Sequence, residues 1–494
     1  MNLLLIILFL ITFSFVAFFF QKNKKFFIIS SVLIVLSFYF FLAKTFLPFS
    51  NFYPSKEIQL YSPCGNFYNL VANSIKEFKI NIFEDIDTES LKIDPSTYKN
   101  TPLLLDTSLY KKKIYLYFGI TPVLLFYLPF NLITTLYLTD RLLVFLLSCI
   151  SFLLSLFLVN SVTKNYKKVP FNLKILTIFL IGLCNLLPFI AINGLIYQVA
   201  VVTANILLLG AFCLFYYYTT DINTEIKNIF VFFISLSLCL AVGARPHYIL
   251  FIPIFFSSMI YLSYKESTKI NNIFKAILIF LTPCIIYGSI LALYNYLRFD
   301  SIFEFGWKYQ LNEHNQLVYI PTIKDFIIGL KNNFLLLPNI NDYTFFSLTK
   351  ASGHRIGNEY ITGVLWICPI VAILIFIPNF LKKIYSENKK TFIFLLTFIL
   401  TTAVSIIVAS FFGMIIRYIF EFLSLMVILS VITFFYYINV INDKLLKNFF
   451  NFLFILVFVF SVFMNISLLF CKENFKIHNT LRKTYYTTVI KTLF

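Results

Sequence analysis

Long apolar runs constrain this chain more than any other feature. Twelve such runs recur along 494 residues that are 60% hydrophobic and only 13% charged. A helix needs about 20 apolar residues to cross roughly 30 Å of bilayer hydrocarbon, and most of these runs approach or reach that length. We therefore predict an all-α, polytopic membrane protein with about 12 transmembrane helices. The predicted spans are 2–20, 26–47, 142–162, 175–193, 196–218, 228–244, 247–264, 275–294, 362–380, 391–412, 417–439 and 448–470.

The positive charges are distributed unevenly between the loops. The formal net charge is +18, and alternate short loops are basic: 21–25, 163–174, 265–275, 381–390 and 442–447. The positive-inside rule places these loops in the cytoplasm, so the two long loops face outward. Acids and bases balance in both, eight against eight in 49–115 and six against six in 295–361. Because a nucleic-acid footprint needs a basic excess, nucleic-acid binding is excluded.

A shorter apolar stretch, residues 114–131, contains Pro122 and Pro129. Counting it as a span would reverse the charge pattern of every later loop, and prolines break helices. We predict instead an interfacial or partly re-entrant segment on the outer face, anchored by Tyr115, Tyr117 and Tyr127 at headgroup depth.

The predicted organisation follows from these spans. Two N-terminal transmembrane helices, the first of them retained rather than cleaved as a signal peptide, precede a first outward loop with its interfacial helix. A helix bundle, a second outward loop, further transmembrane helices and a basic tail complete the chain. The N-terminal helices occupy 1–47 and the first outward loop with its interfacial helix 48–141. The helix bundle occupies 142–294, the second outward loop 295–361, the further transmembrane helices 362–470 and the basic tail 471–494.

The eight cysteines and four histidines form no metal-binding pattern. Six of the cysteines fall inside predicted spans without a CxxC pair, and the histidines have no ligand spacing. We expect these cysteines to be small packing residues. The sequence also lacks a Gly-rich phosphate loop and a GxSxG motif, so it does not predict soluble nucleotide chemistry.

Four polar stretches lie at the predicted outer face. Ionisable groups at a bilayer boundary cost free energy unless they are paired, solvated or used, so each stretch is a candidate site. They are the first-loop acids Glu84, Asp85, Asp87 and Asp106, the turn 243–248 with Arg245 and His247, the segment 293–311 with Arg298 and Glu304, and the segment 417–422 with Arg417, Tyr418 and Glu421.

Structural explanations remain open for most of these residues. The acids at 84–87 and the lysines at 111–113 suit a solvated loop, and Arg298 could snorkel to the interface. Arg417 and Glu421 are four residues apart and could form an ion pair that caps a span. Asp106 and Arg245 are the hardest to explain in structural terms alone.

Arginines and a carboxylate at the outer surface suit chemistry on an anionic lipid headgroup. A guanidinium binds phosphate bidentately and stabilises charge on a phosphate leaving group. A carboxylate opposite it can act as general base on an acceptor hydroxyl.

The order of these residues resembles the GT-C superfamily of integral-membrane glycosyltransferases, which use polyprenyl-phosphate-linked sugars. It is similar in particular to a poorly characterised bacterial branch, over roughly residues 60–425. The matching residues are Asp106, Ser108, Tyr110, Lys113, Tyr115, Tyr117, Phe118, Gly119, Pro122, Pro129, Arg245, Pro246, Asn295, Tyr296, Arg298, Phe299, Glu304, Phe305, Gly306, Tyr309, Gln310, Arg417 and Tyr418.

This resemblance implies a GT-C-like fold in a bacterial inner membrane. It implies transfer of a hexosyl or pentosyl group from a polyprenyl-phosphate donor to a glycan, lipid or protein acceptor at the outer face. Asp106 would be catalytic, with Asp85 and Asp87 as second choice. The substrate-binding residues would be Arg245, His247, Arg298, Glu304, Arg417, Tyr418 and Tyr117. Some members need a divalent cation and others do not, so the resemblance leaves a cation open.

The chain also departs from the family pattern. GT-C enzymes usually carry an acid early in the first outward loop, where this chain has Cys64, Gly65 and Asn66. Either a later acid supplies the base or activity is impaired, which would suit a non-catalytic scaffold. A lipid or solute transporter or flippase is the main alternative, although its charges would lie mid-span rather than at span ends. A glycan polymerase or ligase is the nearest enzymatic rival.

Overall fold

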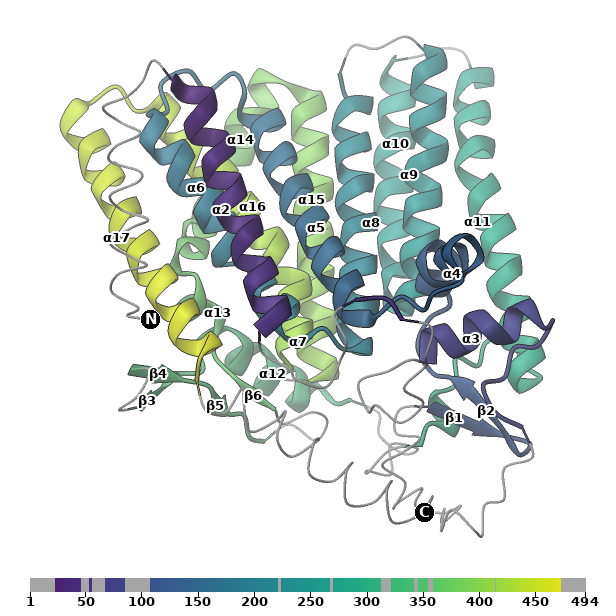
Figure 1. The fold of residues 1–494 in the computed structure, drawn as a ribbon. Helices are drawn as coiled ribbons and strands as arrows, with labels where there is room; N and C mark the ends of the chain where they lie inside the picture. The colour runs from purple at the N-terminus through teal and green to yellow at the C-terminus, as the bar shows by residue number, and fades with distance from the viewer. Residues whose placement is uncertain are drawn as a thin grey trace.

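The computed structural model shows long helices side by side, with short helices and hairpins layered at one end (Figure 1). It describes residues 23–45, 53–55, 67–84, 107–220, 224–266, 270–311, 321–341, 345–353, 359–413 and 415–471. Within these residues, 11 helices are long and apolar enough to cross a membrane. They overlap eleven of the predicted spans, and the other, 2–20, lies outside the described residues. The prediction of a helical, multi-pass membrane protein is confirmed.

The candidate spans are built from single helices or from short helices in series. In chain order they are α2 (Lys24–Thr45), α5 (Asp140–Thr163), α6 (Phe171–Leu183) with α7 (Leu187–Asn193), α8 (Ile196–Tyr218), α9 (Thr224–Ala244), η3 (Pro246–Phe251) with α10 (Ile252–Glu266), α11 (Ile270–Phe299), η5 (Pro369–Phe376) with α14 (Ile377–Glu387), α15 (Lys389–Phe412), α16 (Ile416–Val440) and α17 (Lys444–Leu469).

The remaining elements come mainly from the two long loops. They are α3 (Phe67–Lys76), β1 (Thr107–Tyr110), β2 (Lys113–Leu116), η2 (Val123–Tyr127), α4 (Leu128–Thr134), η4 (Trp307–Tyr309), α12 (Ile323–Leu335), β3 (Asn339–Asn341), β4 (Phe345–Ser347), β5 (Thr349–Lys350), β6 (Tyr360–Ile361) and α13 (Val364–Ile367). The described strands pair as three antiparallel two-stranded sheets, β1–β2, β3–β4 and β5–β6.

The predicted cytoplasmic loops meet at one end of the bundle. Lys168 Nζ donates to Asn442 Oδ1 at 2.8 Å, and Lys447 Nζ donates to the Lys168 carbonyl at 2.7 Å. The Tyr436 hydroxyl donates to Glu387 Oε1 at 3.0 Å. The described parts of both long loops lie at the opposite end of the helices (Figure 1). This is the two-sided arrangement that the charge pattern predicts.

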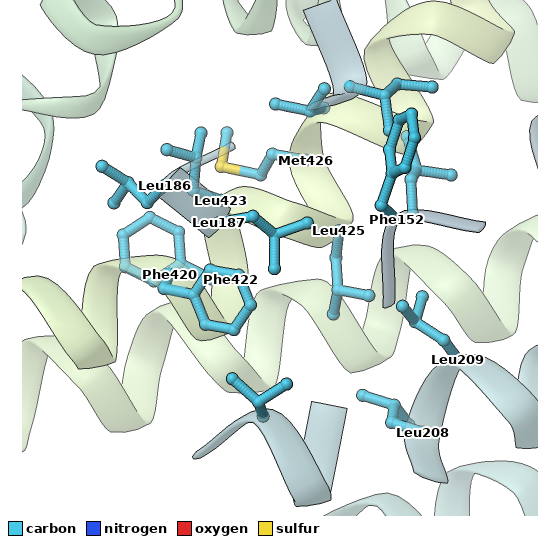
Figure 2. Close-up of a cluster of buried hydrophobic side chains, with 14 of the residues drawn as sticks. Phe152, Leu186, Leu187, Leu208, Leu209, Phe420, Phe422, Leu423, Leu425 and Met426 are labelled. Atoms are coloured by element: carbon cyan, nitrogen blue, oxygen red, sulfur yellow. The ribbon is translucent and has the colours of Figure 1, made fainter. Parts of the chain in front are cut away.

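Helix α16 is buried along almost its whole length. Every side chain from Ile419 to Tyr436 is buried, so other parts of the protein surround the helix over this length. Figure 2 shows its side chains among residues from α5, α7 and α8. The labelled side chains are Phe420, Phe422, Leu423, Leu425 and Met426 of α16, with Phe152, Leu186, Leu187, Leu208 and Leu209 around them. A polar group on α16 therefore needs a protein partner.

The stretch 114–131 differs from its prediction in one respect. It begins as strand β2 and continues through η2 into α4, which runs across the direction of the long helices (Figure 1). Tyr115 and Tyr127 are buried inside the protein, beside Phe299 and Tyr68 respectively. The predicted anchoring of these two tyrosines at headgroup depth is therefore wrong, because their rings pack against other loop and helix residues inside the protein.

The two long loops are joined through the β1–β2 hairpin. The Leu311 amide donates to the Thr107 carbonyl at 2.8 Å, and Ser108 Oγ donates to the Gly306 carbonyl at 3.0 Å. The hairpin turns at Lys111 and Lys112, with φ of 47° and 59°. The three consecutive lysines of this stretch therefore form or adjoin a tight turn. The hairpin and residues 306–311 therefore form one layer shared by the two loops.

Lys111 also forms an ion pair across this layer, with its Nζ 2.5 Å from Asp300 Oδ2. Lys111 and then Tyr110 lower the pKa of the Asp300 carboxyl by hydrogen bonding. We expect Asp300→Asn to change the unfolding temperature little, because the side chains are 68% and 53% exposed. A carboxyl with a lowered pKa stabilises the fold above its unfolded pKa, and this contribution is lost as pH falls through the folded pKa.

Thermal unfolding of both proteins in nanodiscs checks this prediction. The small difference at neutral pH should vanish in acid. A large loss of stability at neutral pH would show that the ion pair, and not the backbone contacts, joins the loops.

Candidate functional site

Arg245 lies where one candidate span turns into the next. Helix α9 ends at Ala244, and Pro246 starts η3, since proline has no N–H to satisfy at the first position of a helix. Arg245 itself is extended, with φ of −142°. This sharp turn directs its side chain toward α16, where Glu421 lies within the second turn from the helix start.

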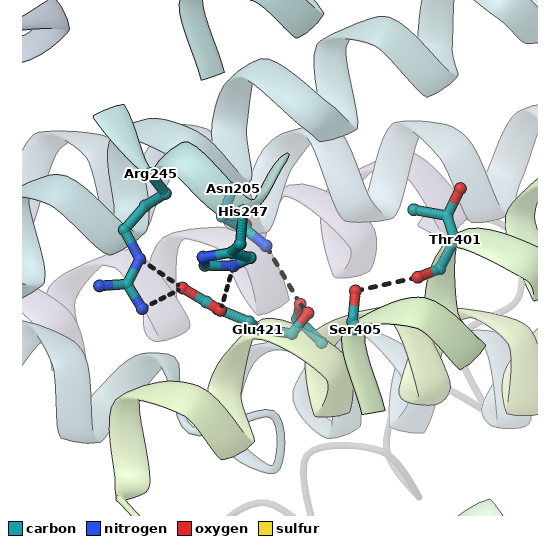
Figure 3. A network of polar contacts seen from close by, with 7 residues as sticks. Asn205, Arg245, His247, Thr401, Ser405 and Glu421 are labelled. Carbon is teal, nitrogen blue, oxygen red and sulfur yellow. Dashed lines mark hydrogen bonds and ion pairs between the residues drawn. The ribbon is translucent and has the colours of Figure 1, made fainter. Parts of the chain in front are cut away.

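Glu421 binds two basic side chains (Figure 3). Arg245 contacts Glu421 Oε1 through Nε at 2.9 Å and Nη2 at 2.8 Å. His247 Nε2 lies 3.0 Å from the other carboxylate oxygen. Glu421 is 5% exposed, so its charge would be costly without these partners. Both oxygens of this carboxylate on α16 therefore have a partner, and we call Arg245, His247 and Glu421 the cluster.

Helix α16 is also fixed one turn further on. Asn205 Nδ2 donates to Ser424 Oγ at 3.1 Å, and Asn205 Oδ1 accepts from Ser151 Oγ at 2.7 Å. These buried contacts join α5, α8 and α16. They hold the rotation of α16 and with it the direction in which Glu421 points.

Arg417 approaches the same cluster from the start of α16. Its Cζ lies 4.6 Å from the centre of the Tyr197 ring and 5.7 Å from that of Tyr418. Arg245 Cζ lies 5.0 Å from the Tyr418 ring centre. Two guanidinium groups, one from the turn after α9 and one from α16, therefore share one tyrosine ring. Such cation–π contacts help to hold each group in place.

The structure contradicts one explanation left open by the sequence. Arg417 and Glu421 do not pair with each other within α16. Glu421 pairs with Arg245 and His247, whereas Arg417 Nη1 donates to Glu359 Oε1 at 3.4 Å. Glu359 belongs to the second long loop and is 41% exposed. Glu421 pairs with Arg245 and not with Arg417, because its buried carboxylate faces the turn after α9.

Four of the predicted substrate-binding residues thus meet: Arg245, His247, Arg417 and Tyr418. A row of aromatic rings leads from Tyr117 to Tyr197, which contacts Arg417. The Tyr117 ring packs edge to face on Phe118 at 5.4 Å, and the Phe118 ring lies 5.3 Å from that of Tyr197.

Arg298 and Glu304 occupy different settings. Arg298 is buried, and it donates to the Leu116 carbonyl at 2.7 Å and to Asn295 Oδ1 at 2.6 Å. Its Cζ lies 4.0 Å from the Tyr294 ring centre, so it connects β2 to the end of α11 instead of reaching the interface. Glu304 accepts from the Gly306 amide at 2.7 Å and orders the turn that follows α11. These contacts are structural in kind.

The predicted acids Asp106, Asp85 and Asp87 lie outside the described residues, so their roles stay predictions. Within the part of the chain that the structure describes, no group of three or more His, Cys, Asp or Glu side chains is placed to hold a metal ion.

Asp140 is a buried acid that the sequence reasoning did not single out. It begins α5, and its Oδ1 accepts the hydroxyl of Tyr127, whose ring stacks on Tyr68 at 5.1 Å. Burial raises the pKa of the Tyr68 hydroxyl, Asp140 raises it further and Arg245 lowers it. Tyr68 is therefore one ring removed from Asp140, through Tyr127. An ionisable residue at the start of an apolar run was the available signal.

Comparison with known proteins adds the following findings. No protein-family model and no curated protein matches the chain. Solved structures of the oligosaccharyltransferase of Archaeoglobus fulgidus are similar to it. AglB in complex with an inhibitory peptide and a dolichol-phosphate has a TM-score of 0.49 at 14% identity, over 90% of this chain and 56% of that chain. The apo form has a TM-score of 0.48 at 13% identity, over 91% and 56%.

This chain thus spans little more than half the length of those structures.

Proposed function

We propose that this protein is a membrane glycosyltransferase that moves a sugar from a polyprenyl-phosphate donor to a glycan, lipid or protein acceptor at the outer face of a bacterial inner membrane. One observation carries the proposal. Arg245, between two candidate spans, and Arg417, at the start of another, converge on the ring of Tyr418 at the end of the bundle that bears both long loops. Paired guanidinium groups at a membrane boundary suit a lipid-linked phosphate.

The two arginines would have different roles. Arg245 already holds a buried carboxylate with two nitrogens and so keeps the cluster in shape. Arg417 is 22% exposed, and its hydrogen bond to Glu359 is long, at 3.4 Å. A phosphate of the donor would compete well with Glu359 for this guanidinium. Arg417 is therefore the proposed phosphate ligand.

The proposed reaction needs one base. The acceptor hydroxyl oxygen bonds to the anomeric carbon of the sugar as the bond from that carbon to the phosphate oxygen breaks. A carboxylate, by resemblance Asp106, takes the acceptor proton. The polyprenyl phosphate leaves as an anion, and Arg417 stabilises the charge that develops on it.

Variants assayed in native membranes with a lipid-linked sugar test this proposal. We expect Asp106→Asn to lose transfer by a factor of about 100 or more while inserting normally. Arg417→Gln should lose about 100-fold for the missing phosphate ligand. Lys112→Gln removes an exposed cation from the hairpin turn and serves as the matched control.

Two results would count against the proposal at different levels. Full activity of Asp106→Asn would refute this assignment of the base. A wild-type protein that moves no sugar from any lipid-linked donor would refute the glycosyltransferase itself.

The location of charge disfavours a transporter. The proposed site lies where α9 ends and α16 begins, at the ends of candidate spans. Ion-coupled carriers instead place their ionisable residues near the bilayer midplane. Uptake or flipping of a labelled lipid by purified protein in vesicles, without sugar transfer, would reverse this preference.

A further inference from the structure

Helix α12 of the second long loop is a well-defined element. Thr322 caps its start, and Asp325 reciprocates: the Thr322 amide donates to Asp325 Oδ2 at 2.9 Å and the Asp325 amide donates to Thr322 Oγ1 at 3.4 Å. This capping box satisfies backbone donors that would otherwise be unpaired at a helix start. The 13 residues of α12 therefore begin at a fixed point.

The two faces of α12 are reversed relative to a helix in water. Its buried face carries Asp325, Gly329 and Asn333. Its exposed face carries Ile323, Ile327 and Leu330, which are 75%, 59% and 37% exposed. We call these three residues the apolar stripe. Their spacing of four and three residues places them on one side of the helix.

Close packing prevents α12 from turning this stripe inward. A Cβ added at Gly329 would lie 2.1 Å from the Ser410 carbonyl oxygen of α15, so the two backbones are in direct contact there. About one helical turn before Gly329, the Phe326 ring stacks on the Phe411 ring of α15, with 4.7 Å between the ring centres. Glycine at position 329 permits this approach, because any side chain there would meet the backbone of α15. The apolar stripe consequently faces away from the protein.

The neighbouring span indicates what covers the stripe. Ser410 and Phe411 belong to the last turn of α15, a candidate membrane span. Leu400 and Ile407 of the same helix are each 44% exposed, as expected for side chains that face lipid. The exposed lysines Lys324 and Lys331 lie beside the stripe on α12. Long lysine side chains beside an apolar face reach headgroups while their stems stay in apolar surroundings.

We propose that α12 lies in the interfacial layer of the bilayer, on the side that bears the two long loops. Ile323, Ile327 and Leu330 would contact the acyl chains, and Lys324 and Lys331 would lie at the headgroups. The occupant of this face is the lipid bilayer, and not a protein partner. The inference does not depend on the glycosyltransferase proposal. It sets the depth of the second long loop and so the level at which Glu359 and Arg417 meet the membrane surface.

Tryptophan fluorescence in nanodiscs tests this placement. Ile327→Trp is measured against the parent protein, whose two tryptophans give the background. We expect lipids with brominated acyl chains to quench the added tryptophan and aqueous iodide to leave it unchanged. Lys112→Trp, at the exposed hairpin turn, should show the opposite pattern and is the control.

Two other outcomes would overturn the proposal. Quenching by iodide alone would place the stripe in water. Quenching by neither agent would show that a protein surface, such as a second copy of the chain, covers it. If Ile327→Trp fails to fold, Ile323→Trp gives the same test at a position that is 75% exposed.

Discussion

Glu421→Gln is expected to destabilise the protein and to abolish transfer. The glutamine has nearly the same shape, but it leaves Arg245 without the charge that balances it in a buried setting. Breaking one partner of a buried ion pair costs about 3–5 kcal/mol. Arg417 shares the Tyr418 ring with Arg245, so the repulsion between the two cations would also rise. Thermal unfolding in nanodiscs and the transfer assay measure the two effects.

A double-mutant cycle separates stability from function at this site. In Arg245→Gln with Glu421→Gln both charges are absent, so we expect stability to recover above that of either single variant. Transfer should not recover, because the proposed phosphate site at Arg417 has lost its support. Glu359→Gln is a matched control: its carboxylate is 41% exposed and 3.4 Å from Arg417, so its removal should cost at most about 1 kcal/mol.

The cycle also has clear contrary outcomes. A Glu421→Gln protein as stable as the wild type would mean that the buried carboxylate is protonated and does not balance Arg245. Recovery of transfer in the double variant would mean that Arg245 is dispensable for the reaction.

The membrane spans were predictable because one physical constraint dominates them. A segment that crosses hydrocarbon must be apolar over its whole length. Such a segment can be recognised from its own sequence, without knowing which helices pack against it. The positions of Arg245 and Arg417 at span ends follow from the same constraint. Even so, the predicted interface anchors Tyr115 and Tyr127 turned out to be buried, since an aromatic side chain near a span end can pack in protein as well as in lipid.

The partners of the charged residues could not be predicted in the same way. Arg245 and Glu421 are separated by 176 residues, and no local pattern indicates which helices are neighbours in space. The i, i+4 rule favoured Arg417 with Glu421 because it considers one helix alone. Asp140 was missed because its partner Tyr127 and the nearby Tyr68 lie in elements whose packing the sequence does not reveal. The roles of Asp106, Asp85 and Asp87 are still those that the resemblance predicts.

The stretch 114–131 and the turn 243–248 meet at a pair of glycines, Gly119 and Gly243. Gly119 ends residues 115–119, a Tyr-x-Tyr-Phe-Gly segment, and Gly243 lies two residues before Arg245. A Cβ added at Gly119 would lie 2.0 Å from the Gly243 carbonyl oxygen, a backbone atom that no rotamer change can move. Gly119→Ala should therefore displace the end of α9 and carry Arg245 away from Glu421.

We expect Gly119→Ala to lower stability by about 1–3 kcal/mol or more, the usual cost of overpacking, and to lose transfer as Arg245 shifts. Thermal unfolding and the transfer assay in the same nanodiscs measure both. Gly288→Ala is a stringent control, because a Cβ there meets nothing within 4 Å in the middle of α11. It should be neutral or stabilising by up to about 1 kcal/mol, the helix preference of alanine over glycine. Equal behaviour of the two variants would show that the Tyr-x-Tyr-Phe-Gly segment is not packed on α9, and the position of Arg245 would then need another explanation.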